Sequence, residues 1–158
     1  MPDSKQTTKK PSATRRSSEI WTEEEKAAMR ESARERRATV RLSPEEQRAE
    51  GEREVRDKIA ELSGSDREIA EGIHALVMNA APSLAPRTYY GMPAYAKDGR
   101  VICFFQPASK FKVRYATLGF QPDANLDDGS MWPTSFALTE LTPANKQRLA
   151  ELVKQAVS

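Results

Sequence analysis

The stretch Thr88-Tyr89-Tyr90-Gly91-Met92-Pro93-Ala94-Tyr95 places three tyrosines around a Gly-x-Pro turn, immediately before the most strand-like part of the chain. Glycine adopts backbone conformations that other residues avoid, and proline fixes the entry to the next strand, which is sufficient reason for a turn here. The side chains of Tyr89, Tyr90 and Met92 would also form a wall of mixed apolar and hydroxyl character, which is typical of a ligand pocket. A purely structural turn and a pocket wall both stay open.

A β-hairpin is expected directly after this turn. Lys97-Asp98-Gly99-Arg100 contains the Asp-Gly pair that favours a two-residue turn, so residues 94–97 should pair with residues 100–103. In this register Tyr95 lies opposite Ile102. Apolar and polar residues alternate over 111–115, which predicts the next strand, and further strands are expected at 118–120 and 134–138.

Alternation along these strands assigns their side chains to two surfaces of the sheet. One surface, with Cys103, Phe105 and Val113, should receive the helices. The other surface carries aromatic and aliphatic groups bordered by cations: Tyr95, Lys97, Arg100, Ile102, Phe104, Lys110, Lys112 and Arg114. An open face of this kind predicts binding of an anionic organic ligand or of single-stranded nucleic acid. The alternative is a solvated face, or one on which N-terminal helices lie with their carboxylates neutralising the cations.

Capping patterns and apolar spacing predict four helices. They are expected at residues 22–38, 43–62, 65–82 and 142–156. Thr22 begins the first with Glu25 three residues later, and Ser43 precedes a proline at the start of the second. The first helix has few apolar residues and should be mostly solvated, whereas the third and fourth carry apolar stripes that face the core.

These elements predict an α+β domain at residues 65–158. Its antiparallel sheet of four to five strands carries the N- and C-terminal helices of the domain on one face. Residues 19–64 form a charged helical extension of two helices, and residues 1–18 a disordered basic tail. The extension is a candidate surface for a protein partner, with solvated helices as the alternative.

Composition excludes several classes of protein. With 25 Lys and Arg against 23 Asp and Glu, the net charge of +2 provides no global basic field for nucleic acid. The single cysteine, Cys103, forms no intrachain disulfide and is expected in the core. His74, the only histidine, lies at the boundary of an apolar stripe.

The sequence shows no nucleophile with a matched base, so a non-enzymatic protein is predicted. It shows no apolar run long enough for a membrane span and no secretion signal, so a cytoplasmic protein without a membrane partner is predicted.

Four motifs carry a resemblance to a known family. They are residues 90–95, Gly99-Arg100-Val101, Lys110-Phe111-Lys112-Val113 and Trp132-Pro133-Thr134-Ser135-Phe136, and together they make residues 66–157 resemble the YdhG-like domain-of-unknown-function family. The resemblance implies a small bacterial α+β protein with a frataxin-like order of elements. Some members of that family are described as frataxin-like intracellular iron chaperones, so the resemblance also implies iron as a ligand.

Iron held for delivery needs hard oxygen ligands on an exposed surface. The folded segment has few acids. Those at 66–71 begin a helix, where the helix dipole stabilises negative charge and explains them. Asp123, Asp127 and Asp128 share a loop and are the candidate metal ligands, with turn formation as the alternative reason for their presence.

Overall fold

The computed structural model describes residues 20–39 and 42–158, so the predicted tail at 1–18 lies outside the described residues. The elements in chain order are α1 (Glu23–Thr39), α2 (Pro44–Glu61), α3 (Gly64–Ala80), β1 (Ala85–Tyr89), β2 (Met92–Lys97), β3 (Arg100–Gln106), the 3-10 turn η1 (Ala108–Lys110), β4 (Ala116–Phe120), β5 (Ser135–Leu138) and α4 (Pro143–Ala156). The strands form one antiparallel sheet in the order β1-β2-β3-β4-β5. The predicted α+β class is confirmed.

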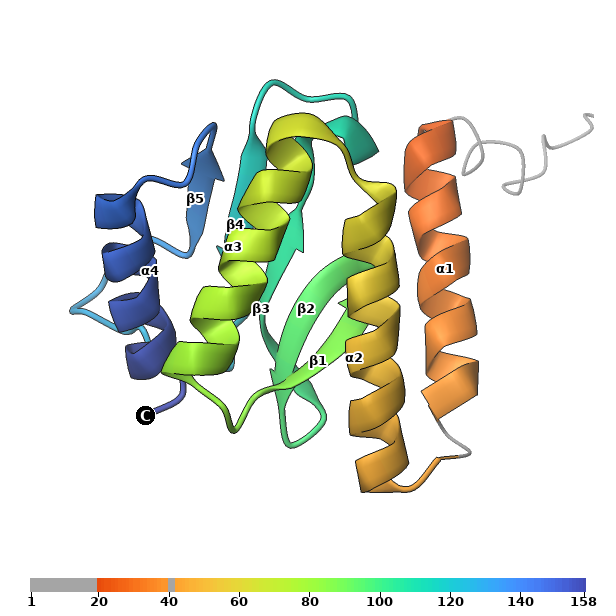
Figure 1. The fold of residues 1–158 in the computed structure, drawn as a ribbon, viewed down its shortest axis with the longest axis horizontal. Helices are drawn as coiled ribbons and strands as arrows, with labels where there is room; N and C mark the ends of the chain where they lie inside the picture. Colours follow the sequence, from red (N-terminus) through yellow and green to blue (C-terminus); the bar gives the residue numbers. More distant parts are fainter. Residues whose placement is uncertain (1–19, 40–41) are drawn as a thin grey trace, which may run out of the picture.

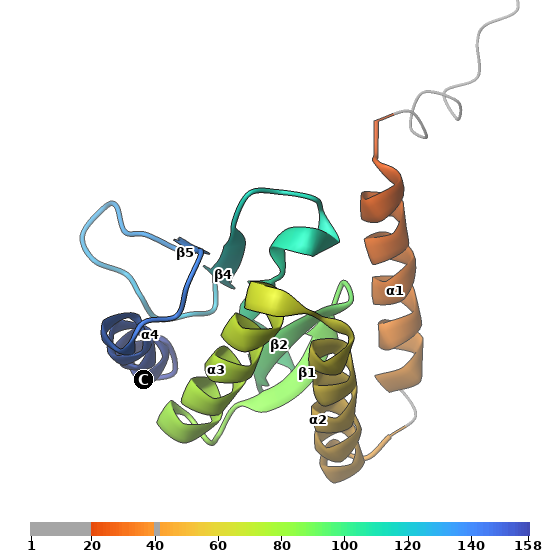
Figure 2. The ribbon, with the colours of Figure 1, turned by 45° about the horizontal axis from the view of Figure 1, so that its top comes forward.

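Helices α2, α3 and α4 lie on one face of this sheet, and α1 lies beyond α2, where it contacts the edge strand β1 (Figures 1 and 2). The core fills the layer between these three helices and the sheet, and Ile73, Phe105, Leu118 and Val153 are fully buried there. The opposite face of the sheet carries none of these three helices. We call it the open face.

The helix starts follow the local capping chemistry. Thr22 accepts a hydrogen bond from the Glu25 backbone N–H at 3.1 Å, and Ser43 accepts one from Glu46 at 3.3 Å. Each such cap contributes about 1 kcal/mol. The third helix differs from the prediction, because α3 begins at Gly64 rather than after Ser65, with Ser63 in the cap position.

The predicted boundary at residue 64 does not separate the extension from the folded core. Val55 and Ile59 of α2 belong to the main hydrophobic core, with exposed fractions of 0% and 6%. Helix α2 approaches β1 closely at Gly51, where an added Cβ would overlap the carbonyl oxygen of Pro86 and lie 3.2 Å from its carbon. The core therefore includes α2, and only α1 remains outside it.

Two tight turns shape the first three strands. Tyr90 and Gly91 join β1 to β2 with φ of 51° and 76°, and Asp98 and Gly99 join β2 to β3 with φ of 51° and 78°. Both pairs have the left-handed conformations that a two-residue hairpin turn requires. The Asp-Gly hairpin and the unusual backbone of Gly91 are thus confirmed, while strand β1 was not anticipated.

The expected pairing of Tyr95 with Ile102 is wrong. Ala96 pairs with Val101 as expected, but a bulge between Tyr95 and Ala96 shifts the register, so Tyr95 pairs with Cys103. A bulge adds one residue to one strand and reverses the parity beyond it. Tyr95 is therefore fully buried on the helix side with Cys103 and Phe105. Phe104 faces the opposite side of the sheet.

The predicted strand at 111–115 is also wrong. Those residues follow η1 as irregular chain, Lys112 has a φ of 53°, and the next strand is β4 at 116–120. The carboxylate of Asp66 at the start of α3 accepts hydrogen bonds from the backbone N–H groups of Ala108 and Ser109 at 2.9 and 3.0 Å. These bonds hold η1 against α3, and the predicted cationic strand face therefore does not form.

Candidate functional site at the turn between strands 1 and 2

Three aromatic rings gather on the open face beside the Tyr90–Gly91 turn. The Tyr89 and Tyr90 ring centroids are 4.6 Å apart with the rings nearly perpendicular, and Phe104 lies 5.8 Å from Tyr89. All three side chains are partly exposed. Edge-to-face and tilted rings at these distances attract one another. We call Tyr89, Tyr90 and Phe104 the aromatic row.

The strands hold this row in place. Met92 is the cross-strand partner of Tyr89 and is 5% exposed, so it forms part of the floor beside the rings. Phe104 pairs with Gly119, where an added Cβ would lie 2.7 Å from ring atom Cε1. The glycine thus leaves the space that the Phe104 ring occupies.

Polar groups border the aromatic row. The strands place no acidic side chain on this face of the sheet. Gln121 donates a long hydrogen bond of 3.5 Å from Nε2 to the Tyr89 hydroxyl. Burial, with a smaller contribution from Tyr90, raises the pKa of the Tyr89 phenol. The strand positions that alternate onto the open face include Arg87 and no Asp or Glu.

Hydrogen-bond donors with an affinity for anions converge on the other side of the turn. The backbone N–H of Gly91 donates to Glu35 Oε1 at 3.0 Å. Lys110 Nζ and Lys58 Nζ lie 4.0 and 3.5 Å from Glu31 Oε2. Successive amides in left-handed conformations and ammonium groups are the donors that bind phosphate or carboxylate. In this structure the carboxylates of α1 take that place.

Gly91 is required by this arrangement for two reasons. Its φ of 76° is one that side chains with a Cβ adopt at a cost. In addition, an added Cβ would overlap the Glu31 carboxylate and lie 2.8 Å from Lys110 Nζ. The glycine of the hairpin therefore lets α1 and Lys110 approach the backbone of the turn.

Lys112 and Arg114 lie further along the irregular loop. Lys112 is 79% exposed, and its Nζ is 2.7 Å from Glu24 Oε1 of α1. This hydrogen bond and the lysine charge hold the pKa of Glu24 below its usual value. Arg114 stacks over the ring of Tyr115, with 5.2 Å from its guanidinium to the ring centroid. Pairing of the lysines with helix carboxylates was part of the alternative drawn from the sequence, but it occurs at η1 and the loop after it and not on a strand face.

The remaining ligand candidate, Tyr95, lies on the helix side, apart from the row. Its hydroxyl and His74 Nδ1 are 2.9 Å apart and form a hydrogen bond. Burial, and then the nearby charge of Arg56, lowers the pKa of His74, while burial raises the pKa of Tyr95. Cys103 beside them is buried, which raises its thiol pKa to about 12 and leaves it a core residue as expected.

The loop aspartates do not form a metal centre. Asp123 pairs with Arg100, with 3.2 Å between Oδ1 and Nη1, and Asp128 is exposed. Asp127 borders a hollow of about 480 Å³ with Phe120 and Trp132. Across the residues that the structure describes, no three or more His, Cys, Asp or Glu side chains are placed so that they could hold a metal ion.

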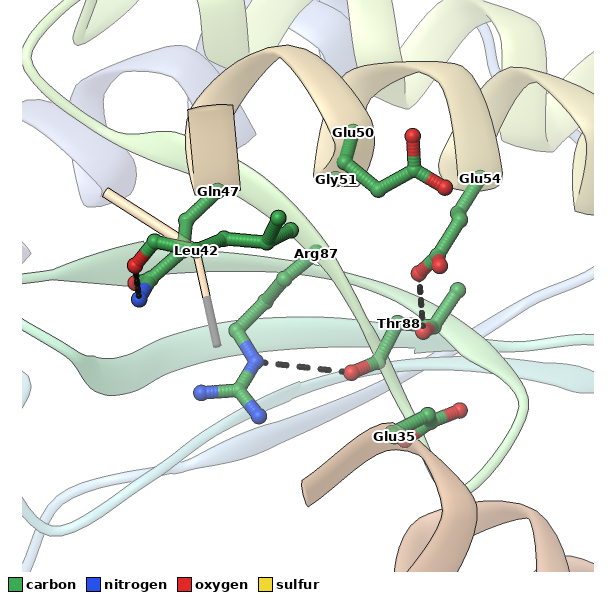
Figure 3. A pocket seen from close by; sticks show the side chains of 8 residues that line it. All are labelled: Glu35, Leu42, Gln47, Glu50, Gly51, Glu54, Arg87 and Thr88. Carbon is green, nitrogen blue, oxygen red and sulfur yellow. Dashed lines mark hydrogen bonds between the residues drawn. The ribbon is translucent and has the colours of Figure 1, made fainter. Parts of the chain in front are cut away.

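A small cavity separates α2 from the edge strand (Figure 3). It measures about 30 Å³ and is lined by Glu35, Leu42, Gln47, Glu50, Gly51, Glu54, Arg87 and Thr88. Thr88 donates to Glu54 Oε2 at 3.1 Å, and Arg87 Nε donates to the Thr88 carbonyl at 3.4 Å (Figure 3). A space of this size holds one water rather than an organic ligand. It belongs to the junction between α2 and β1.

Sequence reasoning missed Glu24, Glu31 and Glu35 as members of this site. The signal was present, because positions separated by seven and four residues fall on one face of a helix. What the sequence did not indicate was that this face would meet the turn at Gly91.

Comparisons with models of known protein families, with curated proteins and with solved structures found no match to this chain. In the described part of the chain, no helix combines the length and apolar character that crossing a membrane requires.

Proposed function

We propose that this protein is a non-enzymatic binding protein for an organic ligand that carries a planar ring and an anionic group, such as a nucleotide or a single strand of nucleic acid. The observation that carries the proposal is the position of the Tyr90–Gly91 turn. The aromatic row extends from one side of it, and the Gly91 N–H and Lys110 lie on the other.

The chemistry of the two halves is complementary to such a ligand. A base or other planar ring gains about 1–3 kcal/mol of binding free energy by stacking on an aromatic side chain, and this gain depends little on which base it is. A phosphate or carboxylate gains from charge-assisted hydrogen bonds to a lysine and a backbone N–H. The open face adds Gln121 and the Tyr89 hydroxyl as neutral hydrogen-bonding groups.

Iron binding is the expectation that the family resemblance adds. The described residues provide no group of three or more ligands for it, so its support is the resemblance alone. It is tested beside the organic ligands, because the two proposals require different side chains.

Isothermal titration calorimetry of the full chain with adenosine monophosphate, a ten-residue oligothymidylate and ferrous iron separates these proposals. We expect Phe104→Ala to weaken binding of the planar anion about tenfold, since one stacking contact is lost. Tyr115→Ala is the matched control, because it removes a ring that is 38% exposed and lies outside the row.

Two results would contradict the proposed function. One is equal affinity of the wild-type chain and Phe104→Ala for the ligand. The other is the absence of binding of either planar anion. Ferrous iron bound in their place, and retained in Phe104→Ala, would favour the role that the resemblance implies. The mononucleotide and the oligothymidylate distinguish a small ligand from a nucleic acid strand.

A further inference from the structure

Helix α1 is held against the rest of the protein mainly by charged contacts. Ala28 and Ser32 are the buried side chains of its described part, and neither belongs to the main hydrophobic core. Met29, the one large apolar residue of this helix, is 38% exposed, and Trp21 just before the helix is 48% exposed. A hollow of about 340 Å³ with many charged side chains separates α1 from α2. The helix thus gains little from apolar burial.

Three glutamates of α1 contact one set of donors. Glu35 accepts from the Gly91 N–H, Glu31 lies between Lys58 and Lys110, and Glu24 pairs with Lys112. Two of these donors, the Gly91 N–H and Lys110, are the ones that the proposed function assigns to the anionic group of the ligand. One helix of the chain therefore occupies the anion-binding half of the site.

The fit of α1 to these donors is incomplete. Glu31 Oε2 is buried, yet it accepts no hydrogen bond from any residue that the structure describes. Both lysine nitrogens near it stand at 3.5 Å or more, which is longer than a charge-assisted hydrogen bond. A ligand oxygen that could approach these donors directly would satisfy them better than Glu31 does.

We infer that α1 is an intramolecular competitor that covers the anion-binding half of the site, and that a phosphate-bearing ligand binds by displacing it. The inference rests on the proposed function. Binding is then coupled to release of α1. The apparent affinity equals the intrinsic affinity multiplied by the fraction of molecules in which α1 is released. A site that is free in about one molecule in ten binds about tenfold more weakly than its intrinsic affinity.

The test compares two triple variants of the full chain with equal net charge. Glu24→Gln, Glu31→Gln and Glu35→Gln together remove the carboxylates that α1 places on the donors. Glu45→Gln, Glu140→Gln and Glu151→Gln together remove three exposed carboxylates that form no ion pair within the described residues. The probe is the ten-residue oligothymidylate, measured by fluorescence anisotropy, with hydrogen exchange of the α1 amides followed in parallel.

We expect the α1 variant to bind about tenfold more tightly than the control variant, and its α1 amides to exchange faster before any ligand is added. In the wild-type chain, saturating ligand should speed exchange of α1 and leave α3 and α4 protected. Equal affinity of the two triple variants, or α1 amides that stay protected when the wild-type chain is saturated, would overturn the inference while the proposed function stands. Failure of all three proteins to bind would contradict both.

Discussion

Replacing Gly91 with alanine tests whether the turn and α1 are joined as the structure indicates. Gly99→Ala is a closely matched control, because both glycines occupy the second position of a two-residue hairpin turn, with φ of 76° and 78°. A Cβ at Gly99 would meet no atom within 4 Å, whereas one at Gly91 would overlap the Glu31 carboxylate and lie 2.8 Å from Lys110 Nζ. The two variants therefore share the backbone cost and differ in the effect on α1.

The magnitudes follow from those contacts. A left-handed alanine costs about 1 kcal/mol relative to glycine, which is the whole expected loss of unfolding free energy for Gly99→Ala. Gly91→Ala also displaces α1 and its hydrogen bond to Glu35, and a helix that is undocked in about one molecule in ten contributes about 1.4 kcal/mol by docking. We expect a total loss of about 2.4 kcal/mol.

Urea unfolding followed by circular dichroism measures the two losses, and hydrogen exchange measures the protection of each helix. Gly91→Ala should lose protection specifically in α1, while Gly99→Ala keeps it. Equal losses of stability in the two variants, with α1 protected in both, would refute the argument that Gly91 is needed for the approach of α1.

Three further predictions concern the core and its junctions. Burial lowers the pKa of His74 in the folded protein, so the unfolded chain takes up a proton at a higher pH than the folded one. The free energy of unfolding therefore keeps the contribution of neutral His74 above a pH of about 6.5 and loses it as the pH falls below that value. His74→Gln should flatten urea-derived stability between about pH 7 and 5, and an unchanged slope would contradict this. Burial of Asp66 acts to raise its carboxyl pKa, but the hydrogen bonds from η1 outweigh this effect and hold the pKa below its usual value. The stabilisation by the carboxylate is therefore present at neutral pH and is lost as the pH falls through the pKa of the folded state. Asp66→Asn should therefore cost about 1–3 kcal/mol at pH 7, and the difference from wild type should narrow in acid; a constant difference would argue against it. Gly51→Ala adds a better helix former, worth about 1 kcal/mol, but its Cβ forces α2 away from the Pro86 carbonyl. Thermal denaturation should therefore show a net loss of about 1–3 kcal/mol in the free energy of unfolding. A stabilised variant would show that α2 does not pack closely there.

The parts of the fold that were predicted from sequence depend on local chemistry. The Asp98–Gly99 turn follows from two adjacent residues that tolerate left-handed conformations, and the caps at Thr22 and Ser43 from side chains within three residues of their partners. Such signals lie within a few positions of one another, so the sequence is sufficient to detect them.

The errors arose where distant residues decide the structure. Alternation over 111–115 is typical of a strand. The backbone of η1, however, donates hydrogen bonds to Asp66, more than forty positions away, and the residues after η1 are irregular chain and not a strand. The bulge after Tyr95 depends on how β2 meets β3, and it places Tyr95 in the core instead of beside Phe104. The candidate site was therefore half predicted: Tyr89, Tyr90, Phe104 and Lys110 gather near the turn, while the α1 carboxylates were missed.

We propose that one ligand is held across the Tyr90–Gly91 turn, with its ring on the aromatic row and its anion at Lys110. The most direct measurement is an NMR titration of the ¹⁵N-labelled full chain with adenosine monophosphate, following every backbone amide. We expect shifts concentrated at residues 89–91, Phe104 and Lys110, together with the amides of α1. Shifts confined to the loop of Asp127, or no shifts at all at millimolar ligand, would contradict it.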